Sequence, residues 1–184
     1  MTSTNTLQLG TNDHYNKMSI SLHWLMVLLL IAVYATIELR EIFPKGSDPR
    51  KAMKIWHFML GLSVLAFALT RLLVRVKTMR PAIVPAPAQW QEILAKIMHV
   101  ALYALMICMP IAGWMILSGE GQVIPFFGLE LPPLINKNKE LAELIEEVHV
   151  TAGTVGYYLI GLHALAGLYH HYFVKDNTLK RILP

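Results

Sequence analysis

Residues 149–163 read HVTAGTVGYYLIGLH, with a histidine at each end and no charged side chain between them. The run free of Asp, Glu, Lys and Arg extends over residues 148–174. Uncharged segments of about 18 residues or more are typical of membrane helices, because about 20 residues at 1.5 Å rise span the hydrocarbon core. The stretch therefore predicts a membrane helix that holds two imidazoles in an apolar environment.

Three further segments have the composition of membrane helices. Residues 18–37 and 97–118 contain no charged side chain. The run 55–70 is shorter, but it continues beyond Arg71, whose guanidinium can reach the interface from near a helix end. The whole chain is 55% hydrophobic and only 15% charged, which is typical of a membrane protein.

We therefore predict a single membrane-embedded domain over residues 1–184. Its expected fold class is all-α, an integral membrane four-helix bundle in up-down-up-down order. The first apolar run is too long for the core of a signal peptide, so it is kept as a span. The spans are expected near residues 18–39, 53–75, 93–118 and 147–172.

Orientation follows from Lys and Arg, which accumulate on the cytoplasmic side of membrane proteins. With four spans, both termini and the middle loop share one side, which carries nine basic and three acidic residues. The opposite side carries seven basic and nine acidic residues. Both termini are therefore expected in the cytoplasm. The pI of about 9.2 reflects this topology, and no nucleic-acid partner is expected.

The longest loop is expected over residues 119–145. Its last part runs into the segment KNKELAELIEEVH (137–149), which has helical composition. We expect this segment either to lie at the outer surface or to extend the last helix. The only cysteine, Cys108, lies inside the third span, where a packing role is expected.

Five histidines are expected inside the membrane, where histidine is rare and usually functional: His23, His57, His99, His149 and His163. At 100° per residue, the fourteen positions between His149 and His163 turn a helix to within about 40° of four full turns. The two imidazoles therefore share one face, about 21 Å apart along the axis. One helix offers one imidazole to each leaflet.

The other helices supply partners at matching depths. His57 lies at the level of His149, whereas His23 and His99 both lie on the cytoplasmic half with His163. Two imidazole pairs at two depths indicate two bis-imidazole b-type haems, and no CxxCH motif for covalent attachment is present. The alternative is that each histidine only hydrogen-bonds across helices.

Glycine follows three of these histidines after four residues, at Gly61, Gly153 and Gly167. Such a glycine removes a side chain on the face where a flat porphyrin would approach the backbone. Ordinary packing of small residues between membrane helices gives the same pattern. His23 and His99 lack this glycine, so the pattern does not choose between them as the partner of His163.

The chain resembles the bacterial cytochrome b561 family of small four-helix dihaem membrane proteins. The resemblance rests on SISLHWL, AVYATIELREIFPKG, HVALY, the histidine near the start of the second helix, and the ending GYYLIGLHALAGLYHHYFVKDNTLKRILP. It implies that His23 pairs with His163 and His57 with His149, as haem-iron ligands, and that His99 is a pocket residue. It also implies the bacterial inner membrane.

The cytoplasmic end contains a second set of candidates. His170 follows His163 by seven residues, on nearly the same face, and imidazole can relay the protons that quinone reduction requires. Cationic and aromatic neighbours suit a quinone headgroup or haem propionates, although basic residues there also bind lipid phosphates. The candidate quinone or pocket residues are His170, Arg71, Arg75, Lys77, Trp90 and His99.

Lysine and arginine also precede His57 on the outer side, where they are normally depleted. We predict an anion-steering role for Arg50, Lys51 and Lys54, because local positive charge attracts a small anion. The whole outer side is nevertheless net negative, so the positive field is local.

Two classes of function fit these features. The first is an oxidoreductase; the resemblance implies a superoxide oxidase that passes electrons from superoxide, on the periplasmic side, to ubiquinone. The second is a haem-bearing anchor subunit that relays electrons for a partner dehydrogenase or hydrogenase. A transition-metal transporter would need ligands gathered at one depth, and the methionines are scattered.

We predict the first, with two haem b groups, ubiquinone as acceptor, and superoxide or another small electron donor. Membrane lipid is an expected partner, and no obligatory protein partner is expected. No residue is assigned a separate catalytic role.

Overall fold

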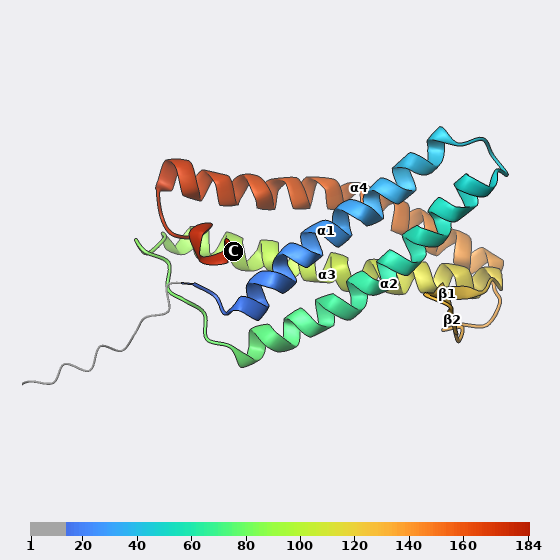
Figure 1. The fold of residues 1–184 in the computed structure, drawn as a ribbon, viewed down its shortest axis with the longest axis horizontal. Coiled ribbons are helices and arrows are strands. Elements are labelled where there is room, and N and C mark those ends of the chain that lie inside the picture. The colour runs from blue at the N-terminus through green and yellow to red at the C-terminus, as the bar shows by residue number, and fades with distance from the viewer. Residues whose placement is uncertain (1–13) are drawn as a thin grey trace, which may run out of the picture.

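The computed structural model describes residues 14–184, and the first thirteen residues of the predicted domain, with the N-terminus itself, lie outside that range. Four long helices make up most of the structure (Figure 1). They are α1 (Lys17–Leu39), α2 (Asp48–Lys77), α3 (Gln89–Glu120) and α4 (Lys139–Tyr169). Shorter elements are the strands β1 (Ile124–Phe126) and β2 (Leu129–Leu131), the 3₁₀ turns Arg40–Ile42 and Lys180–Ile182, and the π-helical turn His170–Val174.

Local sequence signals set the helix ends. The side chain of Asn16 caps α1 by accepting a hydrogen bond from the Ser19 amide at 2.7 Å, and Asn138 caps α4 in the same way through Leu141 at 3.1 Å. Such caps satisfy amides that have no partner within the helix. Gly121, with a φ of 72°, ends α3 in the left-handed conformation that glycine adopts without strain.

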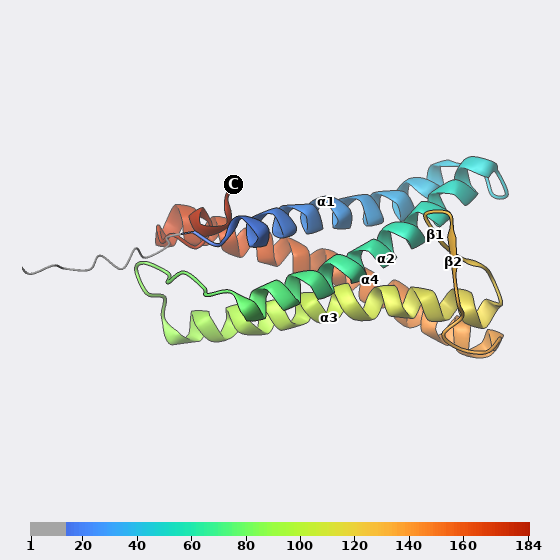
Figure 2. The same ribbon diagram turned by 60° about the horizontal axis from the view of Figure 1, so that its bottom comes forward.

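Successive helices run in opposite directions between the two ends of the molecule, as Figures 1 and 2 show. The pairs α1–α2, α2–α3 and α3–α4 make the most extensive contacts. The largest buried cluster joins α1, α2 and α3 through Met26, Val64, Ala68, Leu102 and Met106. The bundle is therefore held by apolar side chains near the middle of its length.

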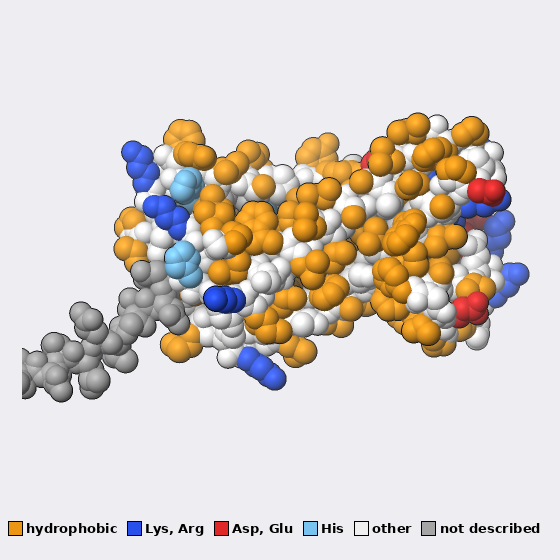
Figure 3. Space-filling model, viewed as in Figure 1, with side chains coloured by type: hydrophobic (Ala, Val, Ile, Leu, Met, Phe, Trp, Pro, Cys, Tyr) orange, Lys and Arg blue, Asp and Glu red, His pale blue; other side chains and the backbone are white. Residues whose placement is uncertain are grey.

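Of the helices in residues 14–184, α1, α2 and α3 are long and apolar enough to cross a membrane. The helix α4 falls outside this group because histidines, glycines and tyrosines lower the mean hydropathy of its uncharged stretch. Apolar side chains cover the long sides of the bundle in Figure 3, and charged side chains gather at its two ends. This surface implies contact with lipid.

The segment after α3 differs from a plain loop. The strands β1 and β2 pair antiparallel, with Ile124 opposite Leu131, and Phe127 and Gly128 form the turn with positive φ. Sequence analysis did not predict this hairpin. Of the two alternatives for residues 137–149, the structure has the extension of the last helix, because α4 begins at Lys139.

The chain ending returns to the bundle and ties together two other segments. The Trp24 indole donates to the Ile182 carbonyl at 2.9 Å, which joins the tail to α1. The Val84 amide donates to the Asn177 side chain at 2.9 Å, and the Arg181 guanidinium donates to the Pro81 carbonyl at 2.5 Å. These bonds hold the loop between α2 and α3 against the tail.

Helices α1 and α4 approach closely at Tyr34. Its hydroxyl donates to the Gly153 carbonyl at 2.9 Å, and its ring packs on Tyr157 with centroids 4.3 Å apart. A Cβ atom at Gly156 would overlap the Tyr34 hydroxyl and lie 3.1 Å from Leu105. Glycine at position 156 is therefore required by this approach.

We expect Gly156→Ala to destabilise the bundle, because the added methyl group must displace Tyr34. The expected loss is about 1–3 kcal/mol, as for other overpacked cores, measured by thermal unfolding in detergent. The control is Gly161→Ala on the same helix, where an added Cβ meets no atom within 4 Å. Equal melting temperatures for the two variants would contradict the close approach.

Candidate functional site

One pair of histidines joins α2 and α4 on the half of the bundle that contains the β hairpin. The ring centroids of His57 and His149 lie 6.3 Å apart, with an interplanar angle of 76°. Nδ1 of His57 lies 3.0 Å from the Val33 carbonyl oxygen, so this nitrogen carries the proton and donates it. Nε2 is then left with a lone pair, which is the form that binds a metal.

The hydrogen bonding of the partner imidazole, His149, is incomplete. Nδ1 of His149 is buried and has no hydrogen-bond partner among residues 14–184. The backbone of α3 lies close by, because a Cβ atom at Gly113 would be 3.6 Å from Cε1 of His149. A buried polar nitrogen without a partner in an apolar bundle is costly. The Met109 backbone lies close enough to serve as its acceptor, which would leave Nε2 to face a bound group.

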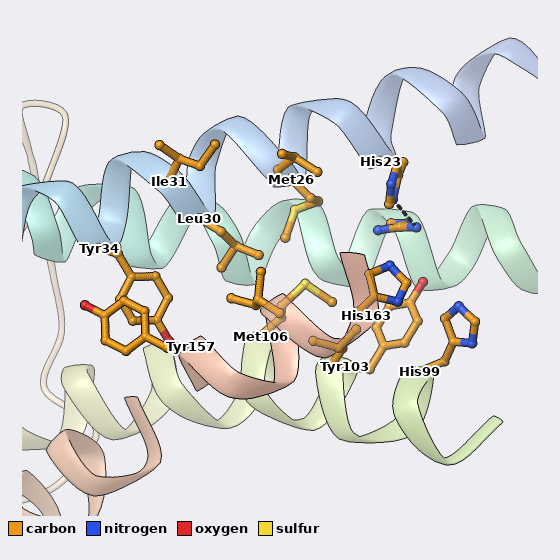
Figure 4. A pocket seen from close by; sticks show the side chains of 14 residues that line it. His23, Met26, Leu30, Ile31, Tyr34, His99, Tyr103, Met106, Tyr157 and His163 are labelled. Atoms are coloured by element: carbon orange, nitrogen blue, oxygen red, sulfur yellow. Dashed lines mark hydrogen bonds between the residues drawn. The ribbon is translucent and has the colours of Figure 1, made fainter. Parts of the chain in front are cut away.

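Three histidines meet on the opposite half of the bundle. His163 of α4 lies 6.3 Å from His23 of α1 and 5.7 Å from His99 of α3, measured between ring centroids. Figure 4 shows the three rings at the same end of one pocket. Both sequence candidates for pairing with His163 are therefore beside it.

The separations fit imidazoles that share one metal ion. With nitrogen–metal bonds of about 2 Å, two rings on opposite sides of an ion have centroids about 6 Å apart. The distances of 6.3, 6.3 and 5.7 Å are all close to this value. Ring separation therefore supports two bis-imidazole sites but does not choose between His23 and His99.

The hydrogen bonds of these two rings differ. Nδ1 of His99 lies 2.5 Å from the Ala95 carbonyl, so it is protonated and leaves Nε2 free. Arg71 donates to Nδ1 of His23 at 2.9 Å, which places the ring proton of a neutral His23 on Nε2. For His23 to bind a metal through Nε2, Arg71 must leave Nδ1.

A cavity of about 430 Å³ lies between the helices at this end. It runs from the three histidines to Tyr34 and Tyr157, as Figure 4 shows. Its volume is within the range of about 300–1,000 Å³ that is usual for cofactor pockets. Most of its wall is apolar, contributed by Met26, Val27, Leu30, Ile31, Leu102, Met106 and Ile160.

Two of the glycines four residues after a histidine face open space. A Cβ atom at Gly61 or Gly167 would meet no atom within 4 Å, and one at Gly153 would meet only the Met109 side chain at 3.6 Å. The space beside these positions is consistent with room for a flat ligand. It does not support packing of small residues between helices at Gly61 or Gly167.

The cytoplasmic candidates are only partly brought together. Arg71 lines the cavity, and the Arg75 guanidinium lies 5.5 Å from the ring centroid of Tyr103, which also lines it. Lys77 and Trp90 are exposed, and Trp90 retains 61% of its accessible surface. The structure therefore places the two arginines, but neither of the other two residues, at the cavity.

His170 has a partner that sequence analysis missed. Its Nδ1 lies 2.5 Å from Oδ2 of Asp176, whose side chain is fully buried. Burial acts to raise the pKa of Asp176, but hydrogen bonds from His170 and Thr178 outweigh it and lower that pKa below its ordinary value. The only indication in the sequence was that Asp176 stands two residues after the end of the uncharged run 148–174.

Arg50 does not remain a free positive charge at the outer end. Its Nη2 donates to both carboxylate oxygens of Glu41 at 2.8 Å, and its Nη1 donates to the carbonyls of Arg40 and Phe43. These bonds close the loop between α1 and α2. Lys51 is exposed beside Asp48 at 3.4 Å, and the Lys54 amine lies 5.5 Å from the Phe58 ring centroid.

Comparison with known proteins identifies the family. The family model described as prokaryotic cytochrome b561 matches residues 14–184. The chain is 37% identical over 172 residues to cytochrome b561 homolog 1 of Escherichia coli K12, covering 94% of this chain and 98% of that protein. It is 39% identical over 170 residues to the probable superoxide oxidase CybB of Yersinia pestis, covering 92% and 96%.

A second Escherichia coli protein, cytochrome b561 homolog 2, is 27% identical over 177 residues, covering 95% of this chain and 93% of that protein. These matches span all four long helices and the tail. They imply b-type haem and electron transfer in a bacterial membrane. The chain belongs to the prokaryotic cytochrome b561 family.

Proposed function

We propose that the protein is a superoxide:ubiquinone oxidoreductase with two b-type haems in the bacterial inner membrane. The observation that carries this proposal is the presence of facing imidazoles, 6.3 Å apart, on both halves of one bundle. Fourteen residues on α4 separate His149 from His163, which is about 21 Å along the axis. Each pair then serves one leaflet.

The residues present fit such haems. His57 with His149 and His23 with His163 are the proposed axial ligands, and the apolar cavity beside His163 has room for a flat ring. Bound haem supplies a one-electron carrier at each depth. Arg71, once it leaves His23, is a cation well placed for an anionic group such as a propionate.

The proposed topology has four spans in up-down-up-down order and both termini in the cytoplasm. Support comes from the alternating helix directions in Figure 1 and from the uncharged stretch of α4. The ends with His170 and His23 then face the cytoplasm, and the β hairpin faces the periplasm.

Superoxide is the proposed donor. It is a small anion that crosses an apolar membrane poorly, so its acceptor must open on the side where it is produced. A relative 39% identical is named a probable superoxide oxidase. Lys54 and the exposed Lys51 provide positive charge on the turns before His57, although Lys51 has an exposed partner in Asp48 at 3.4 Å; Arg50 is paired with Glu41. Two superoxide anions, one ubiquinone and two protons give two O₂ and one ubiquinol.

Ubiquinone is the proposed acceptor at the cytoplasmic end. Its reduction takes two electrons and two protons, and His170 is the proposed group that transfers protons there. Arg71 and Arg75 provide positive charge at the neighbouring cavity.

We expect each proposed ligand variant to remove one haem. His57→Ala or His149→Ala, and likewise His23→Ala or His163→Ala, should lower the haem content from about two to about one per chain, because one imidazole cannot form a bis-imidazole site. Haem content is measured spectroscopically on the purified protein. His99→Ala is the control and should retain both haems. Loss of a haem in His99→Ala but not in His23→Ala would transfer the ligand role to His99.

The topology predicts the activity of reporter fusions. A reporter that is active only in the cytoplasm should be active when fused after Pro184 and inactive when inserted at Gly128, the tip of the hairpin. The reverse pattern would place Lys51 and Lys54 inside and remove the argument for an outer anionic donor.

Charge reversal tests the donor. Lys51→Glu with Lys54→Glu should slow haem reduction by superoxide by about three- to tenfold, because local positive charge raises encounter rates. Reduction by an uncharged reductant should not change. The superoxide rate should also fall as salt shortens the Debye length towards about 8 Å.

The matched control is Lys17→Glu with Lys96→Glu, which has the same charge change on the cytoplasmic side. Equal slowing with both reductants, or haem reduction no faster than superoxide dismutates, would contradict the superoxide proposal. The anchor-subunit function would then take its place.

A further inference from the structure

The end of α4 changes geometry at His170. The helix widens into the π-helical turn His170–Val174, and Lys175 then adopts a φ of 60°, which reverses the chain. The Asp176 amide returns to the His170 carbonyl at 3.3 Å. Single π-helical turns occur frequently at functional sites, and a left-handed lysine is uncommon.

This reversal places a carboxylate against an imidazole. Oδ2 of Asp176 accepts from Nδ1 of His170 at 2.5 Å, and Oδ1 accepts from the Thr178 amide at 2.8 Å. The Asp176 side chain is fully buried, whereas 18% of the His170 side chain remains exposed. The carboxylate therefore has its oxygens occupied, and the imidazole is the member of the pair with access to other groups.

We infer that Asp176 is a positioning residue for proton transfer to the quinone. Its carboxylate holds the proton on Nδ1 of His170, so that Nε2 is the nitrogen that exchanges protons with the substrate and with water. This inference rests on the proposed quinone reduction. It gives Asp176 the role of orienting the His170 ring, which neither the proposed haem ligands nor Arg71 and Arg75 have.

The proton balance follows from this arrangement. Protonated His170 transfers the Nε2 proton to a quinone oxygen that gains an electron, and the neutral ring keeps its proton on Nδ1, where it is hydrogen-bonded to Asp176. Cytoplasmic water then returns a proton to Nε2, and the cycle repeats for the second oxygen. Two one-electron donors supply the two electrons. Asp176 stays ionised throughout and stabilises the imidazolium, as in other His–Asp pairs.

A purely structural role is a weaker account of the pair. Other residues of the tail already anchor it, since Asn177 bonds to both Val84 and Ala82 and Arg181 bonds to Pro81. A buried charge pair is also weak support for stability, because desolvation offsets its attraction. Anchoring alone therefore does not require an acid at position 176.

The decisive variant is Asp176→Asn, which keeps the shape of the side chain and an acceptor for the Thr178 amide. Its amide NH₂ would donate to Nδ1 of His170 and force the ring proton onto Nε2. We expect kcat for quinone reduction to fall at least tenfold, which is part of the roughly 10²–10⁴-fold that general acid–base catalysis contributes. We expect KM for the quinone to stay within about twofold and the haem spectrum to be unchanged.

Two readouts separate positioning from tail anchoring. Nitrogen NMR of labelled histidine in the reduced protein, assigned by comparison with His170→Ala, should show the His170 proton on Nδ1 in the parent and on Nε2 in Asp176→Asn. Asp176→Glu restores a carboxylate and should recover part of the lost kcat. Asn177→Ala removes the bonds to Val84 and Ala82 but keeps the acid, and should leave kcat within about twofold.

The outcomes are distinguishable. Unchanged turnover in His170→Ala would mean that the proposed role of His170 in quinone reduction is wrong. Slow turnover in His170→Ala with normal turnover in Asp176→Asn would overturn the role of Asp176 alone. Equal losses in Asp176→Asn and Asn177→Ala, or no recovery in Asp176→Glu, would reduce Asp176 to an anchor of the tail and also overturn the inference.

Discussion

The structure depends on a single constraint, which is that imidazoles buried among apolar helices need partners. A polar ring nitrogen in hydrocarbon is costly unless it bonds to something. On α4 the constraint acts twice, at His149 and His163, and each ring is met by a histidine from another helix. One partner comes from α2, and the other comes from α1 or α3. All four helices are therefore positioned around these two depths.

Features that depend on local sequence could be predicted, and features that depend on helix rotation could not. Helix existence and the depth of each histidine follow from uncharged runs and from the rise per residue. The choice between His23 and His99 does not follow from the sequence, because both residues lie at the level of His163. Only the packing of α1 and α3 brings each of their rings beside His163. Arg50 was predicted as a free charge for a similar reason: Glu41 is nine residues away and meets it only through the turn between α1 and α2. The pair His170–Asp176 requires a left-handed lysine, which has no sequence signal of its own.

Arg71 shows how a residue placed by its sequence position takes its function from the packing of the helices. Its position near a helix end allows it to reach the interface, and the sequence also makes it a candidate pocket residue. Its guanidinium lines the cavity and bonds to His23. A guanidinium can only donate, so it fixes the proton of a neutral His23 on Nε2, whereas Ala95 and Val33 fix the protons of His99 and His57 on Nδ1. The site at His23 and His163 is therefore chemically unlike the site at His57 and His149 before any cofactor is considered. A partly buried cation that bonds to an uncharged ring has a stronger partner in any anion that enters the cavity.

The chain ending HHYFVKDNTLKRILP is the most extensive part of the family resemblance, and its residues divide into two groups by what they contact. Asn177, Arg181 and Ile182 bond to the loop after α2 and to Trp24, so they close the bundle at the end where His23 and His163 lie. Asp176 instead turns towards His170 of its own helix. The closure restricts where a quinone could approach, because the tail occupies part of this end. The same reversal at Lys175 that docks the tail also delivers the carboxylate, so closure of the bundle and the orientation of His170 are consequences of one backbone turn.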